Sequence, residues 1–316
     1  MVEREEVARG SDVMKRVLIT GGTGLIGRAL SANMAADGYE VIVLSRNPER
    51  AAGLPPDVRA ERWDARTAAG WGALADGAHA VVNLAGEGIS AGRWTAERKR
   101  RIRDSRIDAG RGVVEAIESA KQKPQVLVQA SGVGFYGPRG EEDVLESAPA
   151  GRDYLARLAV EWESSTAAVE AFGVRRVIIR TGIVLSKNGG ALPRMKLPFR
   201  FFLGGRLGSG RQWLPWIHIA DEVGAIRFLL ENEKASGPFN LCAPNPVTNA
   251  DFSRWLGRQM GRPALVPTPG FLLRLVFGEM AGMLLSGQRA VPRHLTQMGY
   301  AFRFAEAEAA LRDISP

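Results

Sequence analysis

The stretch TGGTGLIG, Thr20 to Gly27, separates an apolar run at residues 16–20 from a segment with helical spacing that stops at Gly38. Gly21 permits a tight turn, Gly24 lets a ligand approach the backbone, and Gly27 lets helix and strand pack closely. Free N–H groups at the start of a helix attract phosphate oxygens. A glycine-rich turn without a ligand is the alternative, but a strand before it and a helix after it favour a dinucleotide site. The residues predicted to contact that dinucleotide here are Gly21, Thr23, Gly24, Leu25, Ile26 and Gly27.

The rest of the first half alternates strands with helices. Near-continuous Val/Ile/Leu runs of this kind predict a parallel sheet that is covered by helices on both faces, an α/β doubly wound fold. Thr95 is a plausible N-cap of the longest helix. The predicted strands are residues 16–20, 39–45, 58–64, 79–86, 124–132 and 175–182, and the predicted helices are residues 25–38, 95–120 and 152–172.

The end of the second predicted strand indicates which dinucleotide would bind. An NAD site usually has an acid there to hold the ribose hydroxyls, but this chain has Ser45 and Arg46. A guanidinium can form two hydrogen bonds with a 2′-phosphate, so NADP(H) is favoured, although Arg46 could also be a solvated surface residue. Asp64 could accept a hydrogen bond from the adenine amine or cap a helix.

Composition excludes several classes of protein. The net charge of +8 suits a phosphorylated cofactor or substrate, and no motif that reads RNA or DNA is visible, so no nucleic-acid partner is expected. The single cysteine, Cys242, and three scattered histidines give no expectation of a metal site.

The ends of the chain lead to expectations about location. Residues 1–13 are charged and are interpreted as a leader outside the fold, without a signal peptide, so a cytoplasmic protein is expected. The apolar stretch at residues 271–287 carries Arg274 and Glu279 and is too short and interrupted to span a bilayer. A packed helix and no membrane partner are therefore expected.

Several motifs together resemble a known family. TGGTGLIG, NLAGE (residues 83–87) and SGVGFYG (residues 131–137) resemble the extended short-chain dehydrogenase/reductases. Longer segments resemble more closely an atypical branch of that family, the NAD(P)-dependent epimerase/dehydratase-like "epimerase family" proteins. These segments are NLAGEGIS, RWTAERKRRIRDSRI, GSGRQWLPWIHIADE, LCAPNPVTNADF and GQRAVPRHLTQMGYAFRF.

The resemblance implies two domains and a set of cofactor contacts. It implies an NADP-binding Rossmann domain at residues 14–185, to which 219–235 would return, and a smaller α+β substrate-binding domain at 186–316. By similarity, Ser45, Arg46, Leu84, Ala85, Arg106 and Val184 would touch the cofactor. Gly86, at the carboxyl end of the fourth strand, would also lie against it. The basic run Arg98 to Arg103 is interpreted mostly as solvated surface.

The tyrosine and lysine that these reductases use as a proton-transfer pair are missing. None of the four tyrosines has a lysine four residues later; Tyr154, for example, is followed at that spacing by Leu158. Ser131, at the end of the fifth strand, could position a substrate instead, and Tyr136 could face the nicotinamide or pack on it as an aromatic lid. Acids in the next loop, such as Glu146, could supply a carboxylate or be solvated.

The segment after residue 185 carries the predicted substrate contacts. Arg194 and Arg211 would give a positive cleft for phosphate or carboxylate, and Trp213 could stack on a ring or belong to the core. His218 and Asp221 are expected to be structural, with Asp221 as a helix cap.

Two functions therefore remain open. The first is an NADP-dependent oxidoreductase or epimerase that acts on a small polar, perhaps nucleotide-linked, substrate. The second is an NADP(H)-binding sensor without turnover. The sequence does not predict the oligomeric state.

Overall fold

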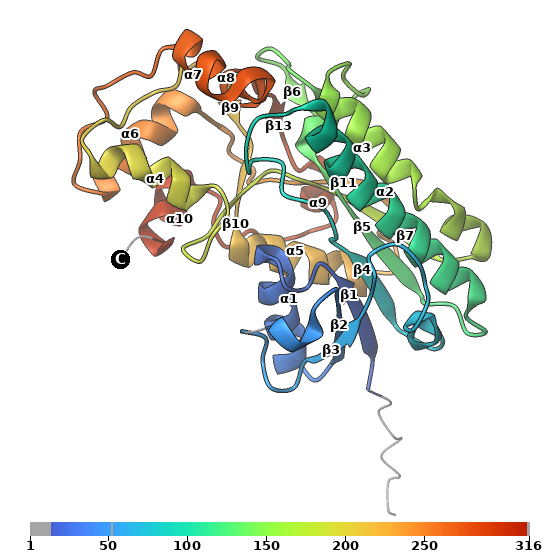
Figure 1. The fold of residues 1–316 in the computed structure, drawn as a ribbon. Helices are drawn as coiled ribbons and strands as arrows, with labels where there is room; N and C mark the ends of the chain where they lie inside the picture. Colours follow the sequence, from blue (N-terminus) through green and yellow to red (C-terminus); the bar gives the residue numbers. More distant parts are fainter. Residues whose placement is uncertain (1–13, 52, 315–316) are drawn as a thin grey trace, which may run out of the picture.

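A seven-stranded parallel sheet forms the centre of the molecule in the computed structural model, which describes residues 14–314 except residue 52. The strand order is β11-β7-β5-β4-β1-β2-β3, so the chain winds outward in both directions from β1 and β4 (Figure 1). The strands are β1 (Arg16–Thr20), β2 (Glu40–Ser45), β3 (Arg59–Arg62), β4 (Ala80–Asn83), β5 (Val126–Gly132), β7 (Arg175–Thr181) and β11 (Gly237–Leu241).

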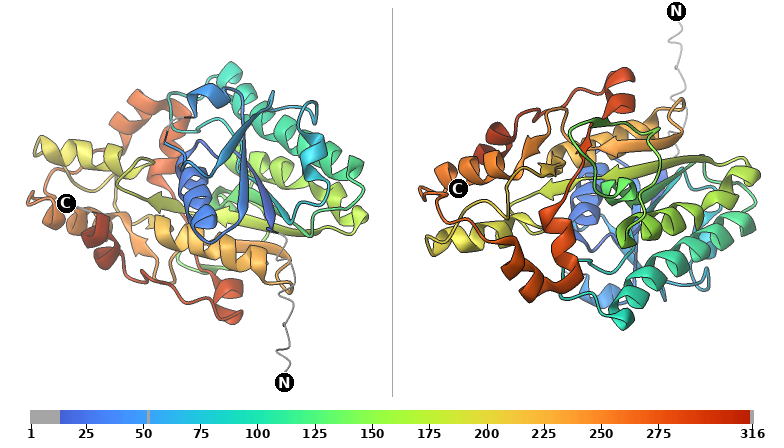
Figure 2. Two further views of the ribbon diagram at one scale, coloured as in Figure 1. Left: turned by 90° about the horizontal axis from the view of Figure 1, so that it is seen from below. Right: turned by 90° about the horizontal axis from the view of Figure 1, so that it is seen from above.

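Alternating side chains of each strand enter two different cores because the sheet is covered on both faces. Val17 and Ile19 of β1 pack with Leu30 of α1 (Leu25–Ala36) and with α5 (Ile219–Glu231) on one face. Leu18 packs on the other face with α2 (Ala96–Ser119), next to which α3 (Tyr154–Ser164) lies. Figure 2 shows these two helical layers on either side of the sheet. The sequence prediction of an α/β doubly wound parallel sheet is confirmed.

The predicted elements agree with the structure except in a few places. All six predicted strands and the N-cap at Thr95 are present, and Thr95 Oγ1 accepts a hydrogen bond from the N–H of Arg98. The predicted helix at 152–172 is two pieces, α3 and a 3-10 helix at Ala167–Phe172, which are separated at the buried Thr166. The strand β11, GPFNL, was not predicted, because its glycine and proline are poor strand formers.

The predicted cap of α5 is wrong. His218 is the N-cap, and its Nδ1 accepts from the N–H of Ala220. Asp221 is buried in the first turn instead, where its carboxylate accepts from the N–H groups of Arg303 and Phe304. Asp221 therefore fixes the C-terminal segment of the chain to α5.

Short elements form the C-terminal lobe, which has its own apolar core around Phe199, Trp216 and Phe252. Its two small sheets pair β8 (Ile183–Leu185) with β10 (Trp216–His218) and β9 (Trp213–Leu214) with β12 (Val247–Thr248). A third pairs β6 (Asp143–Val144) of the N-terminal half with β13 (Arg289–Ala290). The lobe's helices are α4 (Leu192–Arg200), α6 (Asn249–Gln259), α7 (Gly270–Phe277), α8 (Ala281–Leu285), α9 (Arg293–Gln297) and α10 (Ala307–Ile314).

The sequence suggested one packed helix for the apolar stretch at residues 271–287, but the structure differs. The stretch forms α7, a 3-10 turn at Gly278–Met280 and α8, and Leu273 is the buried residue of α7. Within residues 14–314, no helix is long and apolar enough to cross a membrane. The leader predicted for residues 1–13 lies outside the described residues.

Candidate functional site

The glycine-rich loop has the geometry of an anion cradle. Gly21 has a φ of +66°, and a Cβ there would lie 2.7 Å from the carbonyl oxygen of Leu84. At Gly27 a Cβ would lie 2.4 Å from the oxygen of Gly21, so α1 and the loop are in close contact. Gly24 is the N-cap of α1 without a side-chain cap, and the first turn has no acid. The free N–H groups there are left for an anion.

A chain of buried polar side chains holds the carboxyl ends of three adjacent strands together. Thr20 Oγ1 donates to Asn83 Oδ1 at 2.6 Å, and Asn83 Nδ2 donates to Gln129 Oε1 at 2.9 Å. Thr20 Oγ1 also accepts from the N–H groups of Leu84 and Ala85. All three polar side chains are fully buried, so the position of the backbone at Leu84 and Ala85 is fixed by the sheet itself. Sequence analysis missed this chain because its members are far apart in sequence.

Ser45 and Arg46 follow β2, which is next to β1 in the sheet. Ser45 Oγ accepts from the N–H of Asn47 at 3.2 Å. Arg46 is exposed, and its guanidinium has no hydrogen bond or ion pair with any described residue. A cation without a partner is thus present at the sheet edge that carries the glycine loop.

Asp64 is a turn-forming residue in this structure. Its carboxylate accepts from the N–H groups of Arg66 and Thr67 and from the hydroxyl of Thr67. Slight burial acts to raise its pKa, but these hydrogen bonds outweigh it, and the pKa of Asp64 is lowered. No described helix begins at Asp64, so its carboxylate forms a turn and is not the helix cap that the sequence offered as the alternative.

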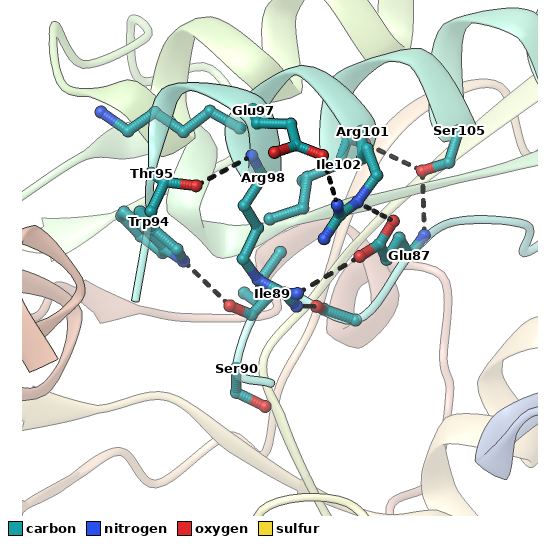
Figure 3. Close-up of polar contacts among 12 residues, drawn as sticks. Glu87, Ile89, Ser90, Trp94, Thr95, Glu97, Arg98, Arg101, Ile102 and Ser105 are labelled. Carbon is teal, nitrogen blue, oxygen red and sulfur yellow. Dashed lines mark hydrogen bonds and ion pairs between the residues drawn. The ribbon is translucent and has the colours of Figure 1, made fainter. Parts of the chain in front are cut away.

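The loop after β4 is held against the start of α2 by a cluster of charges (Figure 3). Arg98 contacts the Glu87 carboxylate at 3.3 Å and donates to the carbonyl of Gly88 at 2.8 Å. Arg101 contacts the same carboxylate, and Ser105 Oγ accepts from the N–H of Glu87. Arg98 is therefore half-buried and holds the loop in place. The sequence had suggested solvated surface at this position. Gly86 is exposed beside this cluster of charges.

Arg106 is the buried cation of the same helix. Its Nη1 donates to the carbonyls of Glu87 and Ile102, and its guanidinium stacks on Trp162 at 4.7 Å. Burial lowers the pKa of Arg106 to about 10, so the side chain remains charged at neutral pH. Arg106 thus brings a positive charge under the loop at Gly86, where a Cβ would lie 3.0 Å from its guanidinium carbon.

Val184 is half-buried on β8, just beyond the sheet edge. The following loop returns to the glycine motif, since a Cβ on Gly190 would lie 2.9 Å from Leu25 Cδ2. The segment that begins the C-terminal lobe therefore passes next to the start of α1, as the predicted contact at Val184 requires.

Ser131 is part of a buried ionic network at the end of β5. Its hydroxyl donates to Glu163 Oε1 at 2.6 Å, and Arg180 binds both oxygens of Glu163 at 2.9 Å. Burial acts to lower the pKa of Arg180, but its bonds to Glu163 and Tyr136 outweigh this and raise the pKa. The Glu163 carboxylate thus has a permanent counter-charge. The sequence alone assigned no role to Glu163.

Tyr136 lies in the interior of this network. It is fully buried, donates to Asn240 Oδ1 at 2.6 Å and accepts from Arg180 at 3.0 Å. Burial raises the pKa of Tyr136 to about 12. The tyrosine hydroxyl therefore already has both of its partners within the protein. Tyr154, by contrast, packs against Trp94 and donates to the carbonyl of Lys99, as expected of a packing residue.

Two further carboxyl groups are buried close by. Glu146 is 3% exposed, which corrects the expectation of a solvated loop acid; its Oε1 accepts from the N–H groups of Asn240 and His294. Glu222 of α5 accepts from the Thr181 hydroxyl, and burial raises its pKa to about 8. In both residues Oε2 is buried without a partner. No group of three His, Cys, Asp or Glu side chains in the described part of the chain could hold a metal ion.

The residues predicted to bind substrate are spread over the C-terminal lobe. Arg194 of α4 donates to the carbonyl and hydroxyl of Ser90 at 2.7 Å, which joins the lobe to the loop after β4. Trp213 donates to Glu141 and stacks against Arg289, whereas Arg211 is exposed. The structure thus brings Arg194 to the loop after β4 and leaves Arg211 at the surface.

Comparison with known proteins identifies the family to which this arrangement belongs. The profile of the NAD dependent epimerase/dehydratase family matches residues 17–242. The chain belongs to that family. A domain of unknown function, DUF1731, matches residues 268–314 of the C-terminal lobe.

Relatives of the whole chain belong to the same family. Epimerase family protein YfhF of Bacillus subtilis is 39% identical over 299 residues, which cover 94% of this chain and 97% of that protein. The crystal structure of human epimerase family protein SDR39U1 with NADPH is 37% identical and has a TM-score of 0.85, covering 95% of this chain and 99% of that one. A nucleoside-diphosphate sugar epimerase from Corynebacterium glutamicum is 33% identical with a TM-score of 0.75, covering 95% of this chain and 58% of that one.

The resemblance to atypical extended short-chain dehydrogenase/reductases is therefore confirmed, as is the Rossmann-type class of the fold. The match across both lobes also explains why the long C-terminal motifs fit the same branch as the glycine loop.

Proposed function

We propose that the protein is an NADP(H)-dependent oxidoreductase or epimerase that works without a tyrosine–lysine pair on a small polar, nucleotide-linked substrate. The observation that carries the proposal is the exposed, unpartnered Arg46 beside the glycine cradle of α1. Binding of NADPH by human SDR39U1 supports the same cofactor here.

The residues at the sheet edge fit NADP(H). The N–H groups of Leu25 to Gly27 would bind the pyrophosphate, and Ser45 with Arg46 would bind the 2′-phosphate. Leu84, Ala85 and Gly86 would lie along the middle of the dinucleotide, with Arg106 beneath them and Val184 beyond. Asp64 would accept a hydrogen bond from the adenine amine with the acceptor position that the turn at Thr67 leaves free.

Ser131 and Glu163 are proposed to handle the proton. The cofactor, when bound, supplies or accepts a hydride at C4 of its nicotinamide ring. Ser131 Oγ donates to Glu163 and keeps its lone pairs free to accept from a substrate hydroxyl. As that hydroxyl loses its proton to Ser131, Ser131 passes its own proton to Glu163, which becomes a neutral carboxylic acid that still accepts hydrogen bonds from Arg180.

Tyr136 is proposed to have a supporting role in place of the catalytic role that the sequence suggested. Its buried hydroxyl holds Arg180 and Asn240 in position and has a pKa raised to about 12, so it is a poor base at neutral pH.

The substrate would lie between the sheet edge and the C-terminal lobe. Arg194 and Arg211 would bind phosphate or carboxylate groups, and Trp213 would contact a ring. The nucleoside-diphosphate sugar epimerase among the relatives supports a nucleotide-linked substrate.

A second candidate function is an NADP(H) sensor without turnover. The observation that favours it is that the hydroxyls of Tyr136 and Tyr154 have partners within the protein and neither tyrosine has a lysine four residues later. The lysine beside Tyr154 is Lys99 of α2, whose Nζ lies over the face of the ring at 4.9 Å from its centre. In this case binding would alter the contact between the two lobes, and no chemistry would follow.

A screen for NADPH oxidation separates the two functions. We expect slow oxidation with carbonyl compounds, including nucleotide-linked keto sugars, that Ser131→Ala reduces at least a hundredfold while NADPH binding remains. Ser119→Ala, at an exposed position of α2, is the matched control and should leave the rate unchanged. Binding without oxidation across the panel would favour the sensor, and absence of NADPH binding would refute both functions.

A further inference from the structure

Exposed apolar side chains gather at one end of the C-terminal lobe. Among the described residues, twelve large hydrophobic side chains are exposed, and ten of them belong to α4, α7 and the segments between them. We call these ten the apolar end; they are Leu197, Phe201, Phe202, Leu203, Leu265, Val266, Phe271, Leu272, Leu275 and Val276. Figure 1 shows α4, α6 and α7 at the upper left of the molecule, on the other side from α2 and α3.

The apolar end is continuous, although its residues come from two parts of the chain. The N–H of Val266 donates to the carbonyl of Gly204, and that of Thr268 donates to the carbonyl of Arg206. The segment that follows α4 therefore lies beside the segment that leads into α7. On α7 itself, Phe271, Leu272 and Leu275 are 40 to 71% exposed, so one face of this helix has no partner among the residues that the structure describes.

Basic residues surround the apolar end, and acids are missing from its sequence. Residues 187–220 contain six lysines and arginines and residues 252–278 contain four arginines, and neither range contains an Asp or Glu. Two surface hollows next to Leu265 are lined by arginines, and Arg262 stacks on the ring of Phe202 at 4.3 Å. The arginines that line these hollows are Arg206, Arg254, Arg258 and Arg262, of which Arg254 is paired with Asp251 at 2.8 Å.

We infer that the apolar end docks on the surface of an anionic lipid bilayer. Leucine and phenylalanine side chains would enter the boundary between headgroups and acyl chains, and the surrounding arginines would bind lipid phosphates. An anionic bilayer complements the positive charge around the apolar end. A second copy of the chain would instead bring the same basic residues against each other. The inference goes beyond the proposed function and departs from the expectation that the protein has no membrane partner.

Sedimentation with vesicles tests the docking surface. The protein should bind vesicles of phosphatidylcholine containing about one third phosphatidylglycerol, bind vesicles of phosphatidylcholine alone far more weakly, and dissociate as salt is raised. The double variants Phe201→Ser with Leu203→Ser, Leu272→Ser with Leu275→Ser, and Arg258→Gln with Arg262→Gln should each lower the partition coefficient about tenfold.

Matched controls lie on the opposite side of the molecule. Val160→Ser on α3, and Arg100→Gln with Arg111→Gln on α2, change exposed residues of the same kinds and should bind vesicles as the unchanged protein does. Circular dichroism and thermal melting check that each variant folds. Lack of binding to the anionic vesicles, or equal losses in the control variants, would overturn the inference. So would a lipid-free dimer in sedimentation velocity that the apolar-end variants dissociate, because the occupant would then be a second copy.

Discussion

Arg46 and Ser131 have opposite environments at the same edge of the sheet. The Arg46 side chain is exposed and has no partner in the described part of the chain, whereas the Ser131 hydroxyl is buried against Glu163. A side chain that makes no contact within the protein contributes little to folding, so its effects should appear in ligand binding. A buried hydroxyl that contacts a paired carboxylate should influence both stability and chemistry.

Replacing Arg46 should change the preference between cofactors. Arg46→Asp should weaken NADPH binding by about 2–3 kcal/mol, the size of a lost charge-assisted hydrogen bond, and leave NADH binding nearly unchanged. Quenching of tryptophan fluorescence measures both affinities. Arg59→Asp, at the exposed first residue of β3, is a suitable control. Equal losses for NADPH and NADH would show that position 46 does not contact the 2′-phosphate.

At this scale, sequence could identify residues in local patterns but not their distant partners. The glycines of residues 20–27 and the cap at Thr95 follow from short-range rules, and the structure agrees with them. Glu163 could not be given a role from sequence, because it is a partner of Ser131 and Arg180 only after β5, β7 and α3 have packed together. The cap of α5 was assigned to Asp221 and not to His218 for a similar reason. The contacts of the aspartate with the N–H groups of Arg303 and Phe304 form only in the folded chain.

At the scale of elements, two glycines of the loop between β1 and α1 have different roles. Gly27 allows close packing, and Gly24 allows close approach of a ligand. Gly27→Ala should destabilise the protein by about 1–3 kcal/mol, because the new methyl would overlap the loop backbone. This steric loss exceeds the roughly 1 kcal/mol that alanine gains over glycine in a helix. Gly24→Ala meets only the Gly21 oxygen, at 3.2 Å, so it should melt nearly normally but bind NADPH more weakly.

Thermal unfolding and NADPH titration of the two variants measure this difference. Gly38→Ala, at the end of α1, is a poor control because its φ of +81° strains any side chain. Ser119→Ala serves better. Unchanged NADPH affinity in Gly24→Ala would mean that the cofactor phosphates do not approach the backbone there.

Sequence patterns predicted whole elements well where burial is regular. The edge strand β3, RAER, is polar and partly exposed, and its pattern in the sequence is weaker. The other five predicted strands were located from runs of Val, Ile and Leu, because both faces of the sheet are buried there. The strand β11 and the short helices of the C-terminal lobe were not, because their stability depends on contacts with other parts of the chain. The exposed face of α7 was also missed, since an apolar sequence alone does not show what covers it.

At the scale of the whole molecule, the two lobes are joined by contacts of different strength. One contact is buried: Asp221 of α5 binds the backbone of the segment at residues 300–304. At the surface, the lobes are joined by Lys99 with Glu279 and by Arg194 with Ser90. Exposed ion pairs contribute about 1 kcal/mol or less each. We therefore expect the lobes to separate more easily near the loop after β4 than at α5.

The contribution of Glu222 to folding stability should fall with rising pH. Burial raises its pKa from 4.5 to about 8, opposed by the hydrogen bond from Thr181. Between these two values the folded protein keeps a proton that the unfolded chain releases. The free energy of unfolding should therefore decrease by up to about 1.4 kcal/mol per pH unit from this group.

Glu222→Gln isolates the contribution of this carboxyl group, because glutamine resembles the protonated acid and does not titrate. Burial lowers the pKa of His79 and His218, which gives the opposite slope up to about pH 6.5, but that slope is common to both proteins and cancels in their difference. Urea unfolding at pH 5, 6, 7 and 8 should show the variant gaining stability over the unchanged protein at each step. The exposed Glu118→Gln should show no such gain, and parallel pH profiles for Glu222→Gln and the unchanged protein would mean that the buried carboxyl is ionised in the fold.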